Sequence, residues 1–290
     1  MIDLPSSVTL DTGEGGLPRL TLDAPGGRAQ LYLHGAHLTA WAPAGEEPVL
    51  WLSPTSHFSP DAAIRGGVPL CFPWFGALEG DATAPSHGFA RLREWEVVAA
   101  QDTDDEVSVT LRLRDDESSR TSPWPHAFEA HYTVAVGRDL TLLLTVTNLD
   151  SVPVTFEEAL HTYLDVRDVT ATEVQGLEDA PYVDRLLGPT PQPAEDAPLT
   201  FSAETDRIYL PTDAGVTVLA PTRTITVDKT GSLATVVWNP WAARAAELTD
   251  MPDDAWPEML CVETCNVRGA AVTALPGQSH TLTAVISTQA

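Results

Sequence analysis

Histidine and glutamate side chains in two distant stretches of the chain could together carry out acid–base chemistry. Glu263 lies in EMLCVETCNV (258–267), and His161 lies in FEEALHTYLDV (156–166). Near neutral pH a carboxylate can accept a proton, and an imidazole can accept or donate one. A sugar offers hydroxyl groups to such side chains and apolar ring faces to aromatic ones. The two residues are therefore candidates for general acid–base catalysis on a sugar.

Glu263 is the stronger candidate of the two, because both faces of its strand are predicted to be buried. A period of two places Glu263 on the same face as Cys261. Leu260 and Val262 alternate with them on the opposite face. A buried carboxylate must be paired or used, since an isolated buried charge is costly. A histidine in an apolar strand such as His161 is more often a hydrogen-bonded core residue.

The stretch IRGGVPLCFPWFG (64–76) places a guanidinium group beside flexible backbone. Arg65 precedes Gly66 and Gly67, whose missing Cβ atoms allow a sharp turn or a close approach to a ligand. The planar fork of an arginine suits an anionic group. The simpler interpretation of this stretch, taken alone, is a bulge ahead of a buried aromatic strand.

Two more stretches contain candidate substrate contacts. PSHGFARLREW supplies His87 and Arg91, and AETDRIYL supplies Asp206. Each has a simpler structural interpretation as well. Arg91 could lie on the solvent face of an edge strand, and Asp206 could form with Arg207 an ordinary surface ion pair of little energetic value.

Composition and charge exclude several kinds of partner. The 290 residues include 41 acidic residues against 16 lysines and arginines, for a net charge of −25. Such a surface repels phosphodiester backbones, so no nucleic-acid partner is expected. The start, MIDLPSSVTL, has no signal-peptide pattern, and no apolar run reaches the length of a membrane span. An anionic small molecule would need a local cluster of arginines, for which Arg65 is the first candidate.

Cysteine usage and missing motifs narrow the chemistry further. Three cysteines cannot all pair with one another, which favours a reduced chain in the cytoplasm. Cys261 and Cys265 lack the spacing and nearby histidines of a zinc site, so no metal is expected. The sequence has no glycine-rich nucleotide loop and no nucleophile elbow. Acid–base chemistry without a cofactor is the enzymatic option that remains.

Strands are expected to position these residues. EVSVTLRLRD alternates apolar and polar residues, and 131–164 predicts successive strands joined at the turn-rich GRD and NLDSVP. The clearest helix candidate, 251–259, is kept short by two prolines. We therefore predict an all-β fold, a large antiparallel β-sandwich or a barrel, with few short helices and forming a single domain over residues 1–290. Similar alternation occurs in 215–221, 222–229, 233–239 and 280–287.

Six motifs occur in a fixed order: IRGGVPLCFPWFG, HGFARLREW, EEALHTYL, TDRIY, VVWNPW with MPDDAW, and CVET. In this order and with these gaps, the chain resembles the glucose-6-phosphate 1-epimerases, or hexose-6-phosphate mutarotases. These form the phosphosugar branch of the aldose 1-epimerase superfamily. The resemblance covers most of the chain and implies a galactose mutarotase-like supersandwich. It also implies interconversion of the α and β anomers of a hexose 6-phosphate, with no cofactor.

The resemblance assigns roles to seven residues. His161 falls on the family's catalytic histidine, and Glu263 falls on its catalytic glutamate. The family often has a glutamine as a substrate contact just before the pocket histidine, where this chain has the shorter Ser86. The implied substrate-binding residues are Arg65, Ser86, His87, Arg91 and Asp206.

The implied reaction needs one base and one acid. Glu263 would take the proton of the C1 hydroxyl while His161 donates a proton to the ring oxygen, which opens the ring to an aldehyde. Rotation about C1–C2 and reclosure give the other anomer. The ordinary pKa values of the two side chains, about 4.3 and 6.5, allow these starting states with modest tuning. Arg65 and Arg91 would hold the 6-phosphate.

Two other functions remain open from the sequence. An aldose 1-epimerase acting on free sugars would turn over glucose and glucose 6-phosphate equally, and the two arginines speak against it. A non-catalytic carbohydrate-binding protein on the same sandwich would leave anomer exchange at its solvent rate. The presence of both His161 and Glu263 speaks against the second alternative. We expect the protein to be a monomer.

Overall fold

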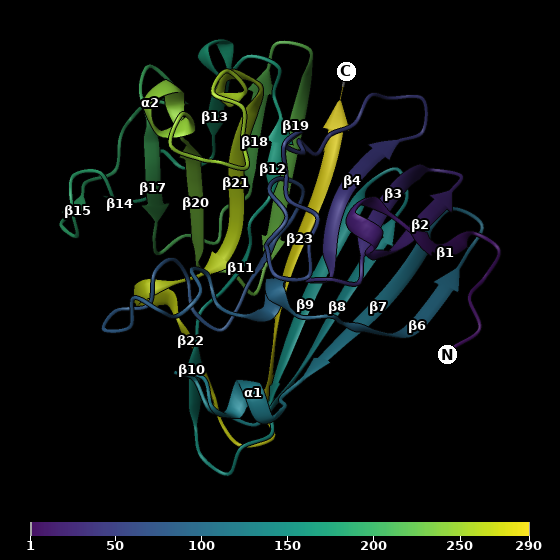
Figure 1. Ribbon diagram of the computed structural model, residues 1–290. Coiled ribbons are helices and arrows are strands. Elements are labelled where there is room, and N and C mark those ends of the chain that lie inside the picture. The colour runs from purple at the N-terminus through teal and green to yellow at the C-terminus, as the bar shows by residue number, and fades with distance from the viewer. Residues whose placement is uncertain (1, 290) are drawn as a thin grey trace.

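The computed structural model describes residues 2–289, which form mainly antiparallel β-strands (Figure 1). The largest sheet has nine strands, and neighbouring strands in it pair in antiparallel register. Its strands, in spatial order, are β16 (Leu199–Thr200), β13 (Glu173–Gln175), β18 (Val216–Ala220), β19 (Arg223–Thr230), β23 (Ser279–Gln289), β9 (Leu140–Asn148), β8 (Phe128–Val136), β7 (Val107–Arg114) and β6 (Glu96–Asp102).

A second sheet of eight strands carries Asp206 and Glu263, and His161 directly follows one of its strands. One of its strands, β12 (Tyr163–Asp165), lies off the main path and pairs with β21. The others, in spatial order, are β15 (Pro191–Gln192), β14 (Tyr182–Asp184), β17 (Thr205–Tyr209), β20 (Ala234–Asn239), β21 (Met259–Asn266), β11 (Glu158–Leu160) and β5 (Leu70–Cys71).

Two smaller sheets and a few short helices complete the structure. The N-terminal sheet contains β1 (Val8–Thr12), β2 (Pro18–Ala24), β3 (Gly27–Tyr32) and β4 (His37–Pro43), and β10 (Val154–Phe156) pairs with β22 (Val272–Ala274). The α-helices are α1 (Glu117–Arg120) and α2 (Trp241–Ala245). Five 3-10 helices cover Glu14–Gly16, Ala90–Leu92, Val169–Ala171, Trp256–Glu258 and Arg268–Ala270.

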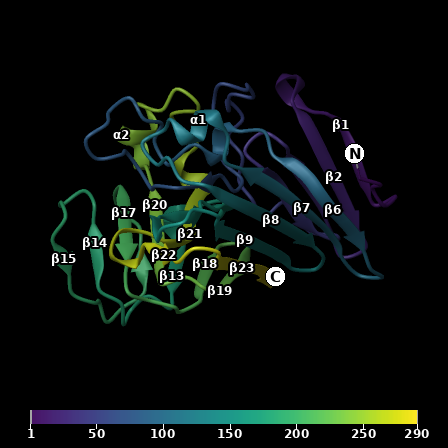
Figure 2. The same ribbon diagram turned by 90° about the horizontal axis from the view of Figure 1, so that it is seen from below.

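The sheets pack on one another through the apolar faces that the sequence alternation predicts. In β7, Val107, Val109, Leu111 and Leu113 are buried and alternate with less buried polar residues. The N-terminal strands β2 and β3 contact β7 and β8, and β21 contacts β23 of the same nine-stranded sheet. Figure 2 shows β1 and β2 beside β6 and β7 at one end, and β17, β20 and β21 at the other. The predicted all-β fold is confirmed.

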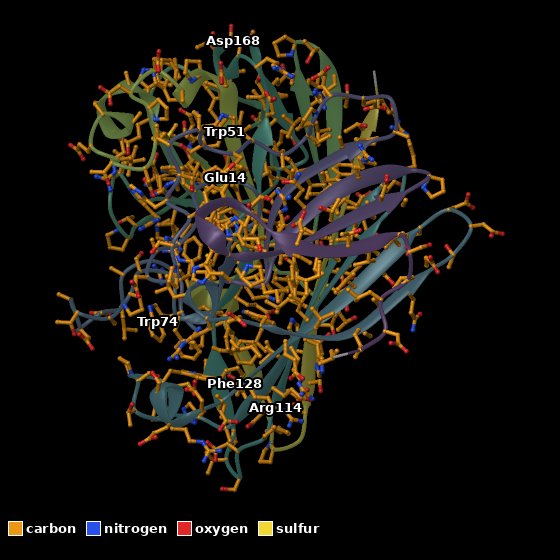
Figure 3. The ribbon with its side chains drawn as sticks, turned by 45° about the vertical axis from the view of Figure 1, so that its right-hand side comes forward. Glu14, Trp51, Trp74, Arg114, Phe128 and Asp168 are labelled. Atoms are coloured by element: carbon orange, nitrogen blue, oxygen red, sulfur yellow. The ribbon has the colours of Figure 1, made fainter. Side chains whose placement is uncertain are left out.

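Aromatic side chains fill one end of the core. Phe72 lies between Phe89, Phe128 and Phe156, with ring centroids 5.2 to 6.2 Å apart. The labelled Trp74 and Phe128 lie in the lower half of Figure 3, among side chains that fill the space between the ribbons. Edge-on and tilted contacts of this kind add to the apolar burial. They anchor the segment that follows β5, which forms one wall of the pocket described below.

The helix predicted at 251–259 is reduced to one 3-10 helix, Trp256–Glu258. Pro257 lies inside it and restricts the backbone, as the sequence anticipated. The helix α2 instead follows β20, and Pro240 stands immediately before its first residue. Proline is well tolerated at such a start because its missing N–H would have no helical partner.

The two glycines after Arg65 let three segments of chain approach one another. Gly66 forms a bridge with Leu52, and its neighbour Val68 forms one with Leu38. Gly67 has a φ of +60° in the left-handed region, and a Cβ atom there would lie 2.1 Å from the carbonyl oxygen of Leu38. No side chain fits at that position without moving backbone, so the sequence needs glycine there.

This geometry predicts a large difference between two glycine-to-alanine substitutions. Gly67→Ala adds a backbone clash to an unfavourable φ and should lower the free energy of unfolding by roughly 3 kcal/mol. Gly45→Ala is the matched control, because Gly45 also has a positive φ, +77°, but no atom within 4 Å of the added Cβ. Gly45→Ala should lower the free energy of unfolding by only about 1 kcal/mol. Urea unfolding of both variants measures the difference, and equal losses would contradict the packing described here.

Candidate active site

All seven residues singled out in the sequence line one pocket of about 360 Å³. Strands β17, β20 and β21 and helix α2 all contribute lining residues, and these elements lie at the upper left of Figure 1. The volume of the pocket lies within the range of small-molecule sites. The residues are Arg65, Ser86, His87, Arg91, His161, Asp206 and Glu263.

Cross-strand register places the acidic residues of the pocket on one face of the sheet. Asp206 in β17 lies opposite Trp238 in β20, and Val236 of β20 lies opposite Glu263 in β21. Since Val236 and Trp238 are two residues apart, their side chains share a face with both carboxylates. Every residue of β21 is buried, as the sequence predicted. Glu263 is therefore held in the sheet between two packed layers.

His161 lies directly after β11 and not within a strand. Its backbone N–H donates to the carbonyl of Pro69 at 3.0 Å, which ties the turn to the segment before β5. The imidazole stacks on Tyr163 with ring centroids 4.9 Å apart, and the edge of Trp238 lies 6.3 Å away. These aromatic rings fix the imidazole and exclude water from one side of it.

The central contact of the pocket joins His161 and Glu263. Nε2 of the imidazole lies 3.3 Å from Oε1 of the carboxyl group, and the two residues are 7% and 1% exposed. Burial, followed by the charges of Arg91 and Arg65, lowers the pKa of His161 well below its ordinary value. Burial, followed by the nearby Asp206, raises the pKa of Glu263 well above its ordinary value.

These shifts correct one sequence-based expectation. The carboxylate and imidazolium forms were expected to need only modest tuning, but burial disfavours both charged forms. Both pKa shifts favour a protonated carboxyl group at Glu263 and a neutral imidazole at His161 in the free protein. An acid and a base are still in contact at 3.3 Å.

Arg65 and Arg91 both line the pocket, but within the described residues only Arg65 pairs with a carboxylate. Arg65 forms an ion pair with Asp250 at 3.0 Å and donates to the hydroxyl group of Tyr163 at 3.1 Å. Arg91, in the 3-10 helix Ala90–Leu92, donates to the carbonyl of Ser86 at 2.8 Å. Among residues 2–289, Arg91 pairs with no carboxylate, so its positive charge is the least compensated in the pocket.

Two more arginines line the pocket that the sequence reasoning did not identify. Arg185, just after β14, pairs with Asp206 at 3.1 Å, so Asp206 does not pair with its sequence neighbour Arg207. Arg244 lies in α2 at the rim. No motif marks Arg185, whereas Arg244 and Trp238 lie in or just after the quoted VVWNPW motif. Four arginines from a chain with only 16 basic residues thus meet at one site.

Buried polar atoms without protein partners concentrate at this pocket. Eight such side-chain atoms occur within the described range, and four belong to pocket residues. Buried polar groups are normally hydrogen-bonded, so a cluster of unsatisfied ones indicates a place where a polar ligand binds. The four atoms are Nε of Arg65, Nε of Arg91, Nδ1 of His161 and Oε2 of Glu263.

The pocket offers no donor set for a metal ion. Between residues 2 and 289, no group of three or more histidine, cysteine or carboxylate side chains is arranged to hold one. Within the same range, none of the helices has the length and apolar character needed to cross a membrane.

The β-sandwich and the histidine–glutamate pocket define the class of protein, a mutarotase-like enzyme. The family model for aldose 1-epimerase matches residues 18–287. The chain belongs to the aldose 1-epimerase family, and the predicted isomerase class and fold are confirmed.

Individual relatives agree with this assignment. A protein of Salmonella typhimurium named "Putative glucose-6-phosphate 1-epimerase" is 37% identical over 250 residues, 86% of this chain and 83% of the relative. A protein of Escherichia coli with the same name is 38% identical over the same shares. The crystal structure of a "putative mutarotase (YeaD)" from Salmonella typhimurium superposes with a TM-score of 0.91 at 33% identity, covering 99% of this chain and 95% of that chain.

The raised pKa of Glu263 predicts how its substitution changes stability. The folded state holds this proton more tightly than the unfolded state, so the carboxyl group lowers the stability of the protein increasingly as the pH rises above about 4.5. Glu263→Gln removes this pH-dependent loss of stability. The melting temperature of Glu263→Gln relative to the wild type should therefore be higher at pH 8 than at pH 4.5.

The exposed Glu79 provides the control for this measurement. Glu79→Gln removes the same charge from the surface and should not show the rising advantage. Thermal unfolding followed by circular dichroism at several pH values compares the variants. A Glu263→Gln variant that loses its advantage as the pH rises would contradict the burial of a protonated carboxyl group.

Proposed function

We propose that the protein interconverts the α and β anomers of a hexose 6-phosphate, with glucose 6-phosphate as the first substrate to test. The observation that carries this proposal is the buried contact between His161 and Glu263 inside a pocket with four arginines. The names of the curated relatives support the same substrate class. Anomerisation transfers no electrons and no chemical group, so proton transfer alone is sufficient.

The phosphate is assigned to Arg65 and Arg91, as the sequence resemblance implies. Guanidinium groups bind phosphate oxygens through paired, charge-assisted hydrogen bonds. Arg91 carries the charge with no carboxylate partner, and Nε of both arginines is buried and unsatisfied. Asp206, held by Arg185, is placed to accept hydrogen bonds from sugar hydroxyl groups. The exposed Ser86 can contribute a hydroxyl group at the rim.

Binding of the phosphate also explains how the catalytic pair becomes charged. The positive charges of Arg91 and Arg65 help to keep His161 neutral in the free protein. A bound phosphate offsets those charges and so favours movement of the proton from Glu263 to His161. Glu263 then acts as the base toward the C1 hydroxyl, and His161 acts as the acid toward the ring oxygen. After reclosure the pair again holds one proton.

Removal of either proton-transfer group should abolish acceleration while binding persists. His161→Ala and Glu263→Gln should each lower kcat by about 10²–10⁴-fold. The arginines remain in both variants, so glucose 6-phosphate should still bind. Two-dimensional exchange NMR measures the anomer exchange rate, and calorimetry measures binding. Exchange at close to the wild-type rate in either variant would refute the assignment.

The phosphate assignment predicts a difference between two substrates. Arg91→Ala should raise KM for glucose 6-phosphate by roughly 10- to 100-fold, since a charge-assisted hydrogen bond contributes about 1.5–3 kcal/mol. KM for glucose should change far less. Arg93→Ala is the matched control, because Arg93 pairs with Asp116 and Ser118 outside the pocket. Equal increases for both sugars in Arg91→Ala would count against phosphate recognition.

We further propose a cytoplasmic monomer organised as one domain over residues 1–290. The three cysteines are free and buried, which suits a reducing compartment. A single large cluster of buried residues contains side chains from the four-, eight- and nine-stranded sheets. Size-exclusion chromatography with light scattering tests the oligomeric state.

A further inference from the structure

His87, which the resemblance implies to be a substrate-binding residue, lies beside the catalytic pair, and its surroundings define which ring nitrogen carries the proton. Its ring centroid lies 5.5 Å from that of His161, and the edge of Phe75 packs against it at 4.7 Å. His87 and Gly88 both have φ in the left-handed region, at +64° and +77°. A Cβ atom on Gly88 would lie 2.0 Å from the carbonyl oxygen of Phe72. The backbone here is strained to hold the imidazole against the pocket.

The two ring nitrogens of His87 have different surroundings. The backbone N–H of Gly76 donates to Nδ1 at 3.3 Å. A backbone amide can only donate, so Nδ1 must carry a lone pair and no proton. Sγ of Cys71, at the end of β5, also lies 3.3 Å from Nδ1, where its S–H can donate. A neutral imidazole with a bare Nδ1 carries its proton on Nε2.

The remaining contacts make this arrangement rigid. The backbone N–H of His87 donates to the carbonyl of Gly76 at 2.7 Å, so the two residues are joined in both directions. The backbone N–H of Phe75 donates to Glu157 at 2.8 Å, and Glu157 in turn pairs with Arg268. Glu157 thus fixes the segment that presents the Gly76 amide. Within residues 2–289, Nε2 of His87 forms no hydrogen bond, and the residue lines the pocket.

We propose that the Cys71 thiol and the Gly76 amide are positioning groups, which fix the substrate-binding His87 as the neutral tautomer that presents Nε2–H to the bound sugar. The inference rests on the proposed sugar substrate. It gives a function to the cysteine at the centre of IRGGVPLCFPWFG. It also leaves His161 as the imidazole that gains and loses the catalytic proton.

The charges around His87 act in the same direction as the hydrogen bonds. Burial, followed by nearby positive charge, lowers the pKa of His87 well below its ordinary value. Burial raises the pKa of the Cys71 thiol, which keeps its proton available for donation. An imidazolium would also have to place a proton on Nδ1, against the Gly76 amide. The titratable and charged groups that face His87 are Cys71, Arg91, His161, Arg185 and Arg65.

Long-range ¹H–¹⁵N NMR of the full-length, histidine-labelled protein tests the tautomer directly. Loss of one signal set in His87→Gln assigns the resonances of His87. We expect Nε2 protonated and Nδ1 unprotonated from pH 5.5 to pH 8. A proton on Nδ1, or an imidazolium that forms in this range, would overturn the proposal. The measurement uses the free protein, so it stands even if glucose 6-phosphate is not a substrate.

Two substitutions of Cys71 test its part in the arrangement. Cys71→Ser retains a hydroxyl donor for Nδ1, whereas Cys71→Ala removes the donor. His87 should keep the wild-type tautomer and pKa in Cys71→Ser, and its pKa should rise measurably in Cys71→Ala. Identical His87 titration in Cys71→Ala and the wild type would show that the thiol is not a positioning group.

Activity measurements distinguish a hydrogen-bonding role of His87 from a purely structural one. The side-chain amide of His87→Gln can donate from the place of Nε2, whereas His87→Ala cannot donate. His87→Ala should raise KM for glucose 6-phosphate about tenfold, and His87→Gln should recover most of that loss. Equal impairment of the two variants, with both folded by circular dichroism, would refute the donor role.

Discussion

The contact between His161 and Glu263 is the interaction on which the rest of the site depends. Burying two ionisable groups 3.3 Å apart is unfavourable unless they share their charge or proton. The eight-stranded sheet makes this possible, because β21 is covered on both faces and holds Glu263 without freedom to reach water. Anomerisation requires an acid and a base close to one another, and this buried contact provides both.

Charge in the pocket is opposite to charge on the molecule as a whole. The chain carries a net charge of −25, yet Arg65, Arg91, Arg185 and Arg244 converge on the catalytic pair. Arg65, Arg185 and Arg244 pair with Asp250, Asp206 and Glu247 respectively, which leaves Arg91 as the main attraction for an anion. The pocket therefore offers an anionic ligand a local positive field within a molecule of negative net charge. The charges of Arg91 and Arg65 also contribute to the lowered pKa of His161.

The sequence predicted the all-β fold well, because the alternation of apolar and polar residues along strands such as β7 reflects which side chains are buried. It also predicted the seven pocket residues, which lie in ordered motifs. It missed Arg185, because an arginine after a short strand has no local pattern and its role arises only from pairing with Asp206. It did not anticipate the direction in which burial and neighbouring charges shift the pKa values of His161 and Glu263, since those neighbours come from segments far apart in the chain. It placed His161 in a strand, whereas the chain turns there between β11 and β12.

Infrared difference spectroscopy can test directly whether Glu263 carries a proton in the free protein, as its raised pKa predicts. The spectrum of the wild type minus that of Glu263→Gln, recorded near pH 7 without ligand, isolates the absorption of one carboxyl group. A protonated Glu263 should give the C=O stretching band of a carboxylic acid, and this band should weaken when glucose 6-phosphate binds. A spectrum with only carboxylate bands in the free protein would contradict this prediction.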